Sequence, residues 1–200
     1  MTSGPSRLFD DMRLLAVDAS VAINLLGTGR AADILRLIGR RFVIEDSARA
    51  EVQRNPSNGQ PGSQSLGALS QSGLLTYVRL RDSAHASFLA LTGAEPPDDL
   101  DDGEAATIAL AVDTGAVALL DDRKAIRVAQ QRHSGLVILQ TLDLLSCDAL
   151  VAAVTSAELA DIVYAALQNA RMRVPLPFRK WTVGIIGNER AAKCPSLGAV

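Results

Sequence analysis

Short apolar segments separated by helix-like segments run through most of the chain. Runs that are almost entirely aliphatic occupy 14–19, 42–46, 74–80, 116–121 and 135–140. Such runs are typical of strands that are buried on both faces. Composition and apolar spacing predict helices over 20–29, 30–41, 47–55, 82–93, 104–115, 123–133, 142–154 and 156–170. This alternation predicts an α/β fold in which a central parallel sheet of about five strands carries helices on both faces.

The connecting segments are less regular. Segment 56–65 is rich in Gly, Pro, Ser, Asn and Gln and predicts an exposed loop, and 94–103 predicts an acidic loop. Ser20 is available as the N-cap of the first helix. The final residues fit no clear element. We therefore expect a domain over 1–174 and a C-terminal extension over 175–200, which packs on its own domain or binds another chain.

Composition narrows the class of protein. The chain is 48% hydrophobic and 21% charged with a formal net charge of -2, which excludes a strongly basic nucleic-acid coat but leaves room for a local basic patch. Cys147 and Cys194 form no CxxC pair, so neither a zinc ribbon nor a disulfide framework is expected. The N-terminal segment lacks the apolar core of a signal peptide, and no apolar run reaches the roughly 18 residues of a membrane helix. We expect a cytoplasmic protein without a membrane partner.

Acidic residues stand where the predicted strands end. Asp18 ends the first strand, and Asp121 and Asp122 follow the fourth. Glu51 lies in the helix after the second strand, and Glu104 opens the helix before the fourth. Ligands of parallel sheets bind at the carboxyl ends of the strands, so these carboxylates meet if the first and fourth strands are neighbours. Clustered carboxylates need countercharge, and oxygen ligands favour Mg²⁺ or Mn²⁺, whose usual chemistry at such sites is phosphodiester hydrolysis.

Four sequence pieces in order carry a family resemblance. They are LLAVDASVAINLL, VIEDSARAEVQRNP, LDDGEAATIALA and VALLDDRKAIRVA. Together they resemble a PIN-domain ribonuclease of the VapC toxin type, in the subgroup with Gly-Glu and Asp-Asp-Arg motifs. The resemblance covers roughly 13–145, with weaker agreement to about 174. Glu104 stands where the family more commonly has Asp, which would place a metal slightly further out.

The resemblance implies a three-layer PIN-like fold and a metal-dependent endoribonuclease, the toxin of a toxin–antitoxin pair. It further implies an RNA substrate, Mg²⁺ or Mn²⁺ as cofactor, an antitoxin partner and a homodimer, for which the apolar helices in 30–41 and 82–93 are suited. The expected catalytic residues are Asp18, Glu51, Glu104 and Asp122. The expected metal ligands are Asp18, Glu104, Asp121 and Asp122, and the expected substrate-binding residues are Ser20, Asn24, Arg123 and Lys124.

Each of these residues also has an ordinary structural interpretation. Asp18 and one of the paired aspartates could be helix caps and nothing more. Glu104 could simply stabilise a helix N-terminus, and Glu51 could belong to a solvated helix face. The basic residues after Asp122 could form an ordinary charged helix face. Asp101 or Asp102 could assist the site or belong to a solvated loop.

Two other functional classes fit the sequence less well. The alternative function is a PIN-like module that binds RNA or protein without cleaving, which acids at all four positions disfavour. A phosphatase would require DxD after the first strand, where this chain has DAS, and a receiver domain would require an Asp after the third.

Overall fold

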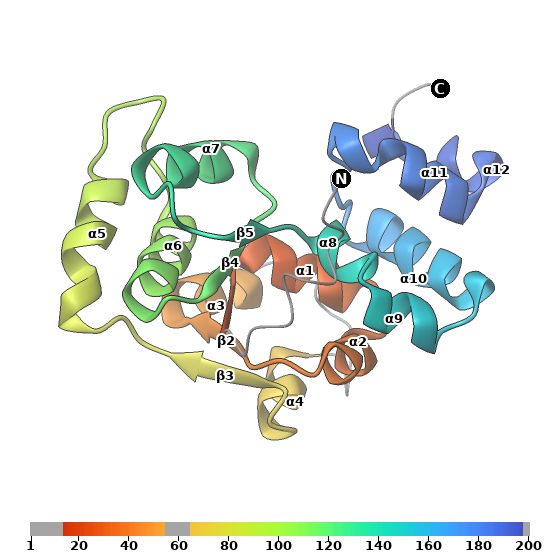
Figure 1. Cartoon of the computed structure of the whole chain (residues 1–200), viewed down its shortest axis with the longest axis horizontal. Helices are drawn as coiled ribbons and strands as arrows, with labels where there is room; N and C mark the ends of the chain where they lie inside the picture. The colour runs from red at the N-terminus through yellow and green to blue at the C-terminus, as the bar shows by residue number, and fades with distance from the viewer. Residues whose placement is uncertain (1–13, 55–64, 198–200) are drawn as a thin grey trace.

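The structure is a computed structural model that describes residues 14–54 and 65–197. Its centre is a five-stranded parallel sheet in the order β3-β2-β1-β4-β5 (Figure 1). The strands are β1 (Leu15–Val17), β2 (Phe42–Glu45), β3 (Leu75–Val78), β4 (Val117–Leu119) and β5 (Ile138–Leu139). β1 pairs with β4, with Val17 opposite Leu119, so the carboxyl ends of the first and fourth strands are adjacent, as a shared acidic site requires.

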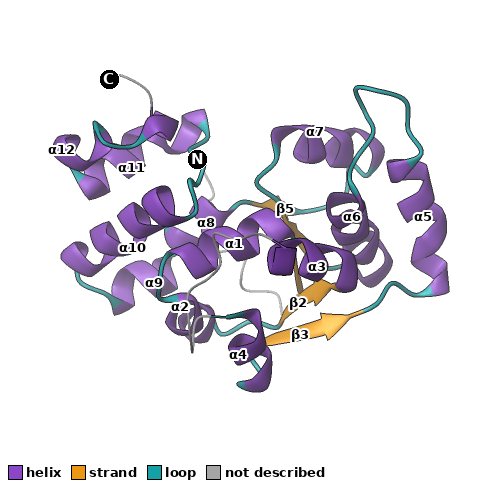
Figure 2. Cartoon of the chain, turned by 180° about the vertical axis from the view of Figure 1, so that it is seen from behind, coloured by secondary structure: helices purple, strands orange, loops and turns teal. Residues whose placement is uncertain are grey.

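Helices cover both faces of this sheet (Figures 1 and 2). They are α1 (Ala19–Gly27), α2 (Ala31–Ile38), α3 (Asp46–Arg54), α4 (Leu66–Gln71), α5 (Asp82–Thr92), α6 (Asp102–Thr114), α7 (Arg123–Arg132), α8 (Thr141–Leu145), α9 (Asp148–Ala153), α10 (Ser156–Asn169), α11 (Arg179–Ile186) and α12 (Asn188–Ala191), with short 3-10 turns η3 (Leu176–Phe178) and η4 (Pro195–Leu197). Within the described part of the chain, no helix combines the length and hydropathy that crossing a bilayer requires.

Alternation along the strands divides the interior into two cores. Ala16 and Ala118 point towards α5, α6 and α7, whereas Leu15, Val17 and Leu119 point towards α1, α2 and α8–α10. Each face of the sheet is therefore covered, which is why the strands are continuous apolar runs. The predicted three-layer α/β architecture is confirmed.

Helix α6 lies against the sheet through small side chains. Ala105, Ala106, Ala109 and Ala111 are completely buried; Ala105 and Ala111, with the larger Ile108, share one core with the strand residues Ala16 and Ala118, which are themselves alanines. Because alanine adds only a methyl group, the helix axis lies close to the strands. This packing holds the first turn of α6 beside the carboxyl ends of β1 and β4.

Several predicted boundaries were wrong. The predicted helix over 142–154 is two helices, α8 and α9, separated at Ser146 and Cys147. At this break, Ser146 Oγ donates to the Leu142 carbonyl over 2.7 Å, and the backbone of Cys147 is extended. The N-cap of α1 is Asp18 rather than Ser20. The acidic loop ends earlier than expected, because α6 begins at Asp102. Most of the predicted loop 56–65 lies outside the described residues.

The C-terminal segment contains helices that the sequence did not predict. Thr182, Ile186, Cys194 and Leu197 are buried, and α11 packs on α10. The Arg179 guanidinium also donates to the Leu197 carbonyl over 2.7 Å. The segment thus packs on its own chain, one of the two arrangements that the sequence allows. Its separation from the domain at residue 174 stays a prediction.

Candidate active site

Asp18 occupies the junction between β1 and α1. Its backbone N–H donates to Leu119 O over 3.1 Å, which fixes it beside β4. The Ser20 N–H and hydroxyl donate to Asp18 Oδ2 at 3.0 and 2.5 Å, whereas Oδ1 is buried without a hydrogen-bond partner among the described residues. The residue is only 3% exposed, and this burial, with the nearby charge of Glu51, raises the pKa of Asp18 to about 7. Asp18 is therefore a helix cap that also carries an unsatisfied carboxylate oxygen.

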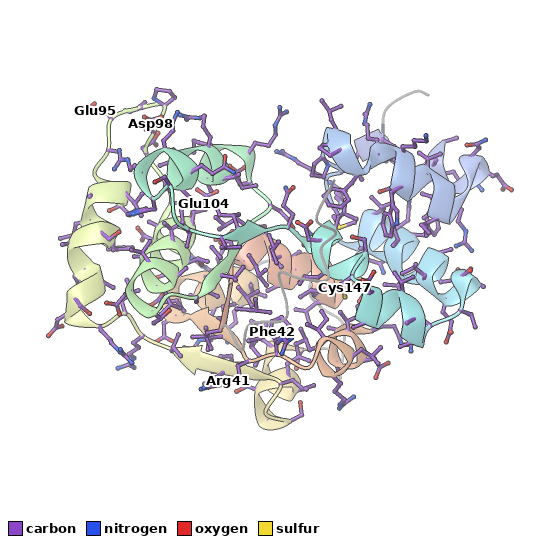
Figure 3. The ribbon with its side chains drawn as sticks, in the orientation of Figure 1. Arg41, Phe42, Glu95, Asp98, Glu104 and Cys147 are labelled. Carbon is purple, nitrogen blue, oxygen red and sulfur yellow. The ribbon has the colours of Figure 1, made fainter. Side chains whose placement is uncertain are left out.

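Glu104 lies in the first turn of α6, in the interior between α6 and α7 (Figure 3). Its backbone N–H donates to Asp101 Oδ1 over 2.8 Å, so Asp101 is the N-cap of this helix. Glu104 is 9% exposed, and burial raises its pKa to about 8, assisted by the charges of Asp101, Asp122 and Asp18. Glu104 therefore interacts electrostatically with acids at the starts of α1, α6 and α7.

Glu51 lines an open cleft of about 790 Å³ between α3 and the start of α6. Burial and the charge of Asp101 raise the pKa of Glu51, and Arg54 opposes this change. Gly103 is where the two helices meet: a Cβ there would lie 2.9 Å from Glu51 Oε2, 3.4 Å from Ala48 Cα and 3.5 Å from Asp101 Oδ1. The absence of a side chain at Gly103 lets these two carboxylates border the same space.

The paired aspartates have different surroundings. Asp121 accepts hydrogen bonds from Asn24 Nδ2 over 2.7 Å, from Thr141 N over 2.9 Å and from the Thr141 hydroxyl. Burial raises the pKa of Asp121, and these bonds oppose that rise. Asp122 caps α7, because its Oδ1 accepts from Lys124 N over 2.7 Å and from Ala125 N over 3.1 Å. Asp121 thus joins β4 to α1 and α8, whereas Asp122 acts electrostatically on Glu104.

The four expected substrate-binding residues form two pairs, one bonded to the acids and one at the start of α7. Ser20 and Asn24 donate to Asp18 and Asp121, so their polar groups hold carboxylates. Arg123 is exposed at the start of α7, and the Lys124 ammonium lies 3.9 Å from Asp99. The structure places all four near the acids, and their contact with a substrate stays a prediction.

Two further acids belong to this region. Asp101, which the sequence indicates only as an assisting residue, borders both Glu51 and Glu104. Sequence reasoning missed Glu45, which is the last residue of β2 and is buried, with the Ser47 N–H donating to its Oε2 over 2.6 Å. Its place at the carboxyl end of a central strand was the available signal.

The donor set fits a hard divalent cation. Within the described ranges, no group of three or more His, Cys, Asp and Glu side chains is arranged closely enough to hold a metal ion by itself. Mg²⁺, however, keeps several waters and commonly takes one or two carboxylates together with substrate phosphates. Asp18 Oδ1 has no donor among the described residues, and Glu104 faces like charges, so both carboxylates would be stabilised by a cation.

Comparison with known proteins gives one match. A family model described as a PIN domain matches residues 14–175, which include all of the acids described above. No curated protein and no solved structure matches the chain. The matched region ends at the start of the C-terminal segment that packs on α10.

Proposed function

Since the chain belongs to the PIN-domain family, a nuclease-type fold, we propose that it is a metal-dependent endoribonuclease that hydrolyses phosphodiester bonds of RNA. The observation that carries this proposal is the burial of Asp18 and Glu104 beside other acids, Glu51 near Asp18 and Asp18 itself near Glu104. Both have raised pKa values, about 7 and about 8, and within the described residues neither forms an ion pair with Lys, Arg or His. Perturbed carboxyl groups of this kind are characteristic of functional sites.

The carboxylates have separate roles in the proposed reaction. Asp18 and Glu104 would hold Mg²⁺ or Mn²⁺ together with water and substrate phosphate, while Asp122 adds negative charge beside Glu104, and a cation bound there would supply charge neutralisation at the phosphate and activation of water. Glu51 lines the open cleft, where solvent reaches its carboxylate. Burial and the charge of Asp101 raise the pKa of Glu51, which makes its carboxylate a better proton acceptor for the attacking water. Asp121, held by Asn24 and Thr141, keeps the end of β4 in place, and with it Asp122.

Replacing Asp18 by asparagine tests the proposal. Asparagine keeps the shape of the side chain and still caps a helix, but supplies no charge to a cation. We expect Asp18→Asn to reduce cleavage of single-stranded RNA in Mn²⁺ by orders of magnitude while its melting curve shows an intact fold. Asp82→Asn, an exposed acid at the start of α5, is the matched control and should cleave normally.

Equal cleavage by the wild type and Asp18→Asn would remove Asp18 from the mechanism. A wild-type protein that binds RNA but never cleaves it, with either metal, would instead support the alternative of a non-catalytic PIN-like binding module.

The resemblance to VapC-type toxins supports a finer proposal, namely a cytoplasmic toxin neutralised by an antitoxin protein. Expression of the chain alone should then arrest growth, and expression of Asp18→Asn should not. A small protein encoded beside it should restore growth and inhibit cleavage in vitro. Normal growth on expression of a cleaving wild-type protein would contradict the toxin role without affecting the ribonuclease activity.

A further inference from the structure

A second cleft, of about 280 Å³, is lined by the paired aspartates Asp121 and Asp122. Its walls come from three places in the sequence: Ser20 and Asn24 in α1, Asp121 and Asp122 after β4, and Arg171 and Arg173 in the turn after α10. The sequence gives no sign of a role for these two arginines, because the segment after α10 carries no motif.

Residues from both clefts interact with the buried acids. Asp18 receives hydrogen bonds from Ser20 in the second cleft and is affected by the charge of Glu51 in the first. Glu104 is likewise affected by Asp101 in the first cleft and by Asp122 in the second. Residues of both clefts therefore act on Asp18 and Glu104, so both clefts are close to the buried acids.

The charges of the two clefts differ. Among the described residues, the first is lined by Glu51, Asp101 and Asp102 with Arg54 as the one opposing charge, so this part of it repels phosphate unless a cation is present. The second adds Arg171 and Arg173 beside Asp122, and the carboxylate of Asp121 is already held by hydrogen bonds. Of the two, the second cleft is the one suited to a phosphate backbone.

The two arginines are presented to solvent by a fixed turn. Met172 between them is buried, and its N–H donates to Ala166 O over 3.3 Å, which anchors the turn to α10. Both arginines are exposed, and within the described residues neither pairs with an acid. Arg171 has φ of 53°, a left-handed conformation in which glycine would be less strained. A guanidinium group thus occupies a position where the backbone favours another residue, as is common at functional sites.

We propose that Arg171 and Arg173 bind the phosphate backbone of the RNA strand on the Asp122 side of the cleavage site, so that the second cleft guides the substrate across the acids. This rests on the proposed ribonuclease function. Guanidinium groups suit the role because their planar donors match phosphate oxygens and stay charged at all physiological pH values.

Binding to a short fluorescein-labelled oligouridine, measured by anisotropy in Mg²⁺, tests the proposal. The parent is the Asp18→Asn protein, which should bind without cleaving. Adding Arg171→Gln and Arg173→Gln together should weaken binding about tenfold or more, and the slope of log affinity against log salt should fall by about 0.7 for each phosphate that the variant no longer neutralises. Arg41→Gln, an exposed arginine before β2 at the opposite end of the sheet, is the matched control and should change neither (Figure 3).

Two further measurements separate binding from folding. Arg171→Gly relieves the left-handed backbone, so it should melt at the same or a higher temperature than the parent while its affinity for the oligouridine still falls. In the cleaving protein, the double variant should raise KM with little change in kcat.

Unchanged affinity and salt slope in the double variant, or an equal weakening in Arg41→Gln, would overturn the role of these arginines while leaving the ribonuclease proposal in place. No RNA binding by the parent, with no cleavage by the wild type, would overturn both.

Discussion

Glu104→Gln is expected to stabilise the protein, and to do so only above a defined pH. The pKa of Glu104 is about 8 in the folded protein against an ordinary value of 4.5, so the folded state binds this proton more tightly than the unfolded state does. Ionisation therefore opposes folding, starting above pH 4.5 and reaching its full effect near pH 8. Glutamine has the same shape and no charge, so it removes this penalty.

The magnitude follows from the pKa shift. Each pH unit between the unfolded and folded pKa values contributes about 1.4 kcal/mol, so the interval from 4.5 to 7 gives at most about 3 kcal/mol at pH 7. At pH 5 the gain should fall below about 1 kcal/mol. For a chain of this size, about 1 kcal/mol shifts Tm by about 2–4 °C, so the difference at pH 7 is easily measured.

Urea unfolding at pH 5, 7 and 8 in EDTA, followed by circular dichroism, is the assay. Glu95→Gln, in the exposed loop before α6, is the control with the same chemical change and should show no pH-dependent gain (Figure 3). Adding Mg²⁺ or Mn²⁺ at pH 7 should stabilise the wild type more than Glu104→Gln, because the cation relieves the repulsion that the variant lacks. A variant no more stable than wild type at pH 7, or one whose gain is equal at pH 5 and 8, would refute the electrostatic reasoning.

Three other substitutions test the surroundings of the site. Thr141→Val should lower the free energy of unfolding by about 1–3 kcal/mol in chemical denaturation, because the buried Asp121 carboxylate loses the hydrogen bond from the Thr141 hydroxyl. An unchanged denaturation midpoint would contradict this prediction. Gly103→Ala would place a Cβ 2.9 Å from Glu51 Oε2, so RNA cleavage should fall roughly tenfold or more while Tm changes little. Full activity of this variant would show that the Glu51 carboxylate is free to move away. If the expected homodimer uses α5, Leu89→Asp, at a side chain that is 65% exposed, should convert it to a monomer in sedimentation; a wild-type monomer at micromolar concentration would exclude the dimer.

The strand ends could be predicted because two local signals coincide there. An aliphatic run identified β1, and the charge that stops it identified Asp18 as a residue at the carboxyl edge. The same combination placed Asp121 and Asp122 after β4, and the parallel topology then placed both ends side by side. The hydrogen bond from Thr141 to Asp121 could not be predicted, because Thr141 begins the helix that follows a different strand, β5.

Other features depend on packing that no local pattern records. The C-terminal helices α11 and α12 are short, and their stability comes from the packing of α11 on α10 and of α12 on α11 rather than from their own sequence. Gly103 could be taken for a loop residue beside Glu104, whereas its importance lies in the distance to Glu51 on another helix. The left-handed conformation of Arg171 also could not be predicted, because glycine or asparagine is the residue usually found in this conformation after a helix.

The alanine packing between α6 and the sheet has a consequence for how mutations distribute over this protein. Ala105, Ala106 and Ala109 carry no chemistry, yet each is completely buried, and Ala105 belongs to the same core as the strand residues Ala16 and Ala118. A larger side chain at any of them would push α6 outward, and the helix would carry Asp101 and Glu104 away from Asp18 and Asp122. In a saturation scan for activity, these alanines should therefore be as intolerant as the acids, and a map of sensitive positions would extend along the buried side of α6 well beyond the residues that touch substrate.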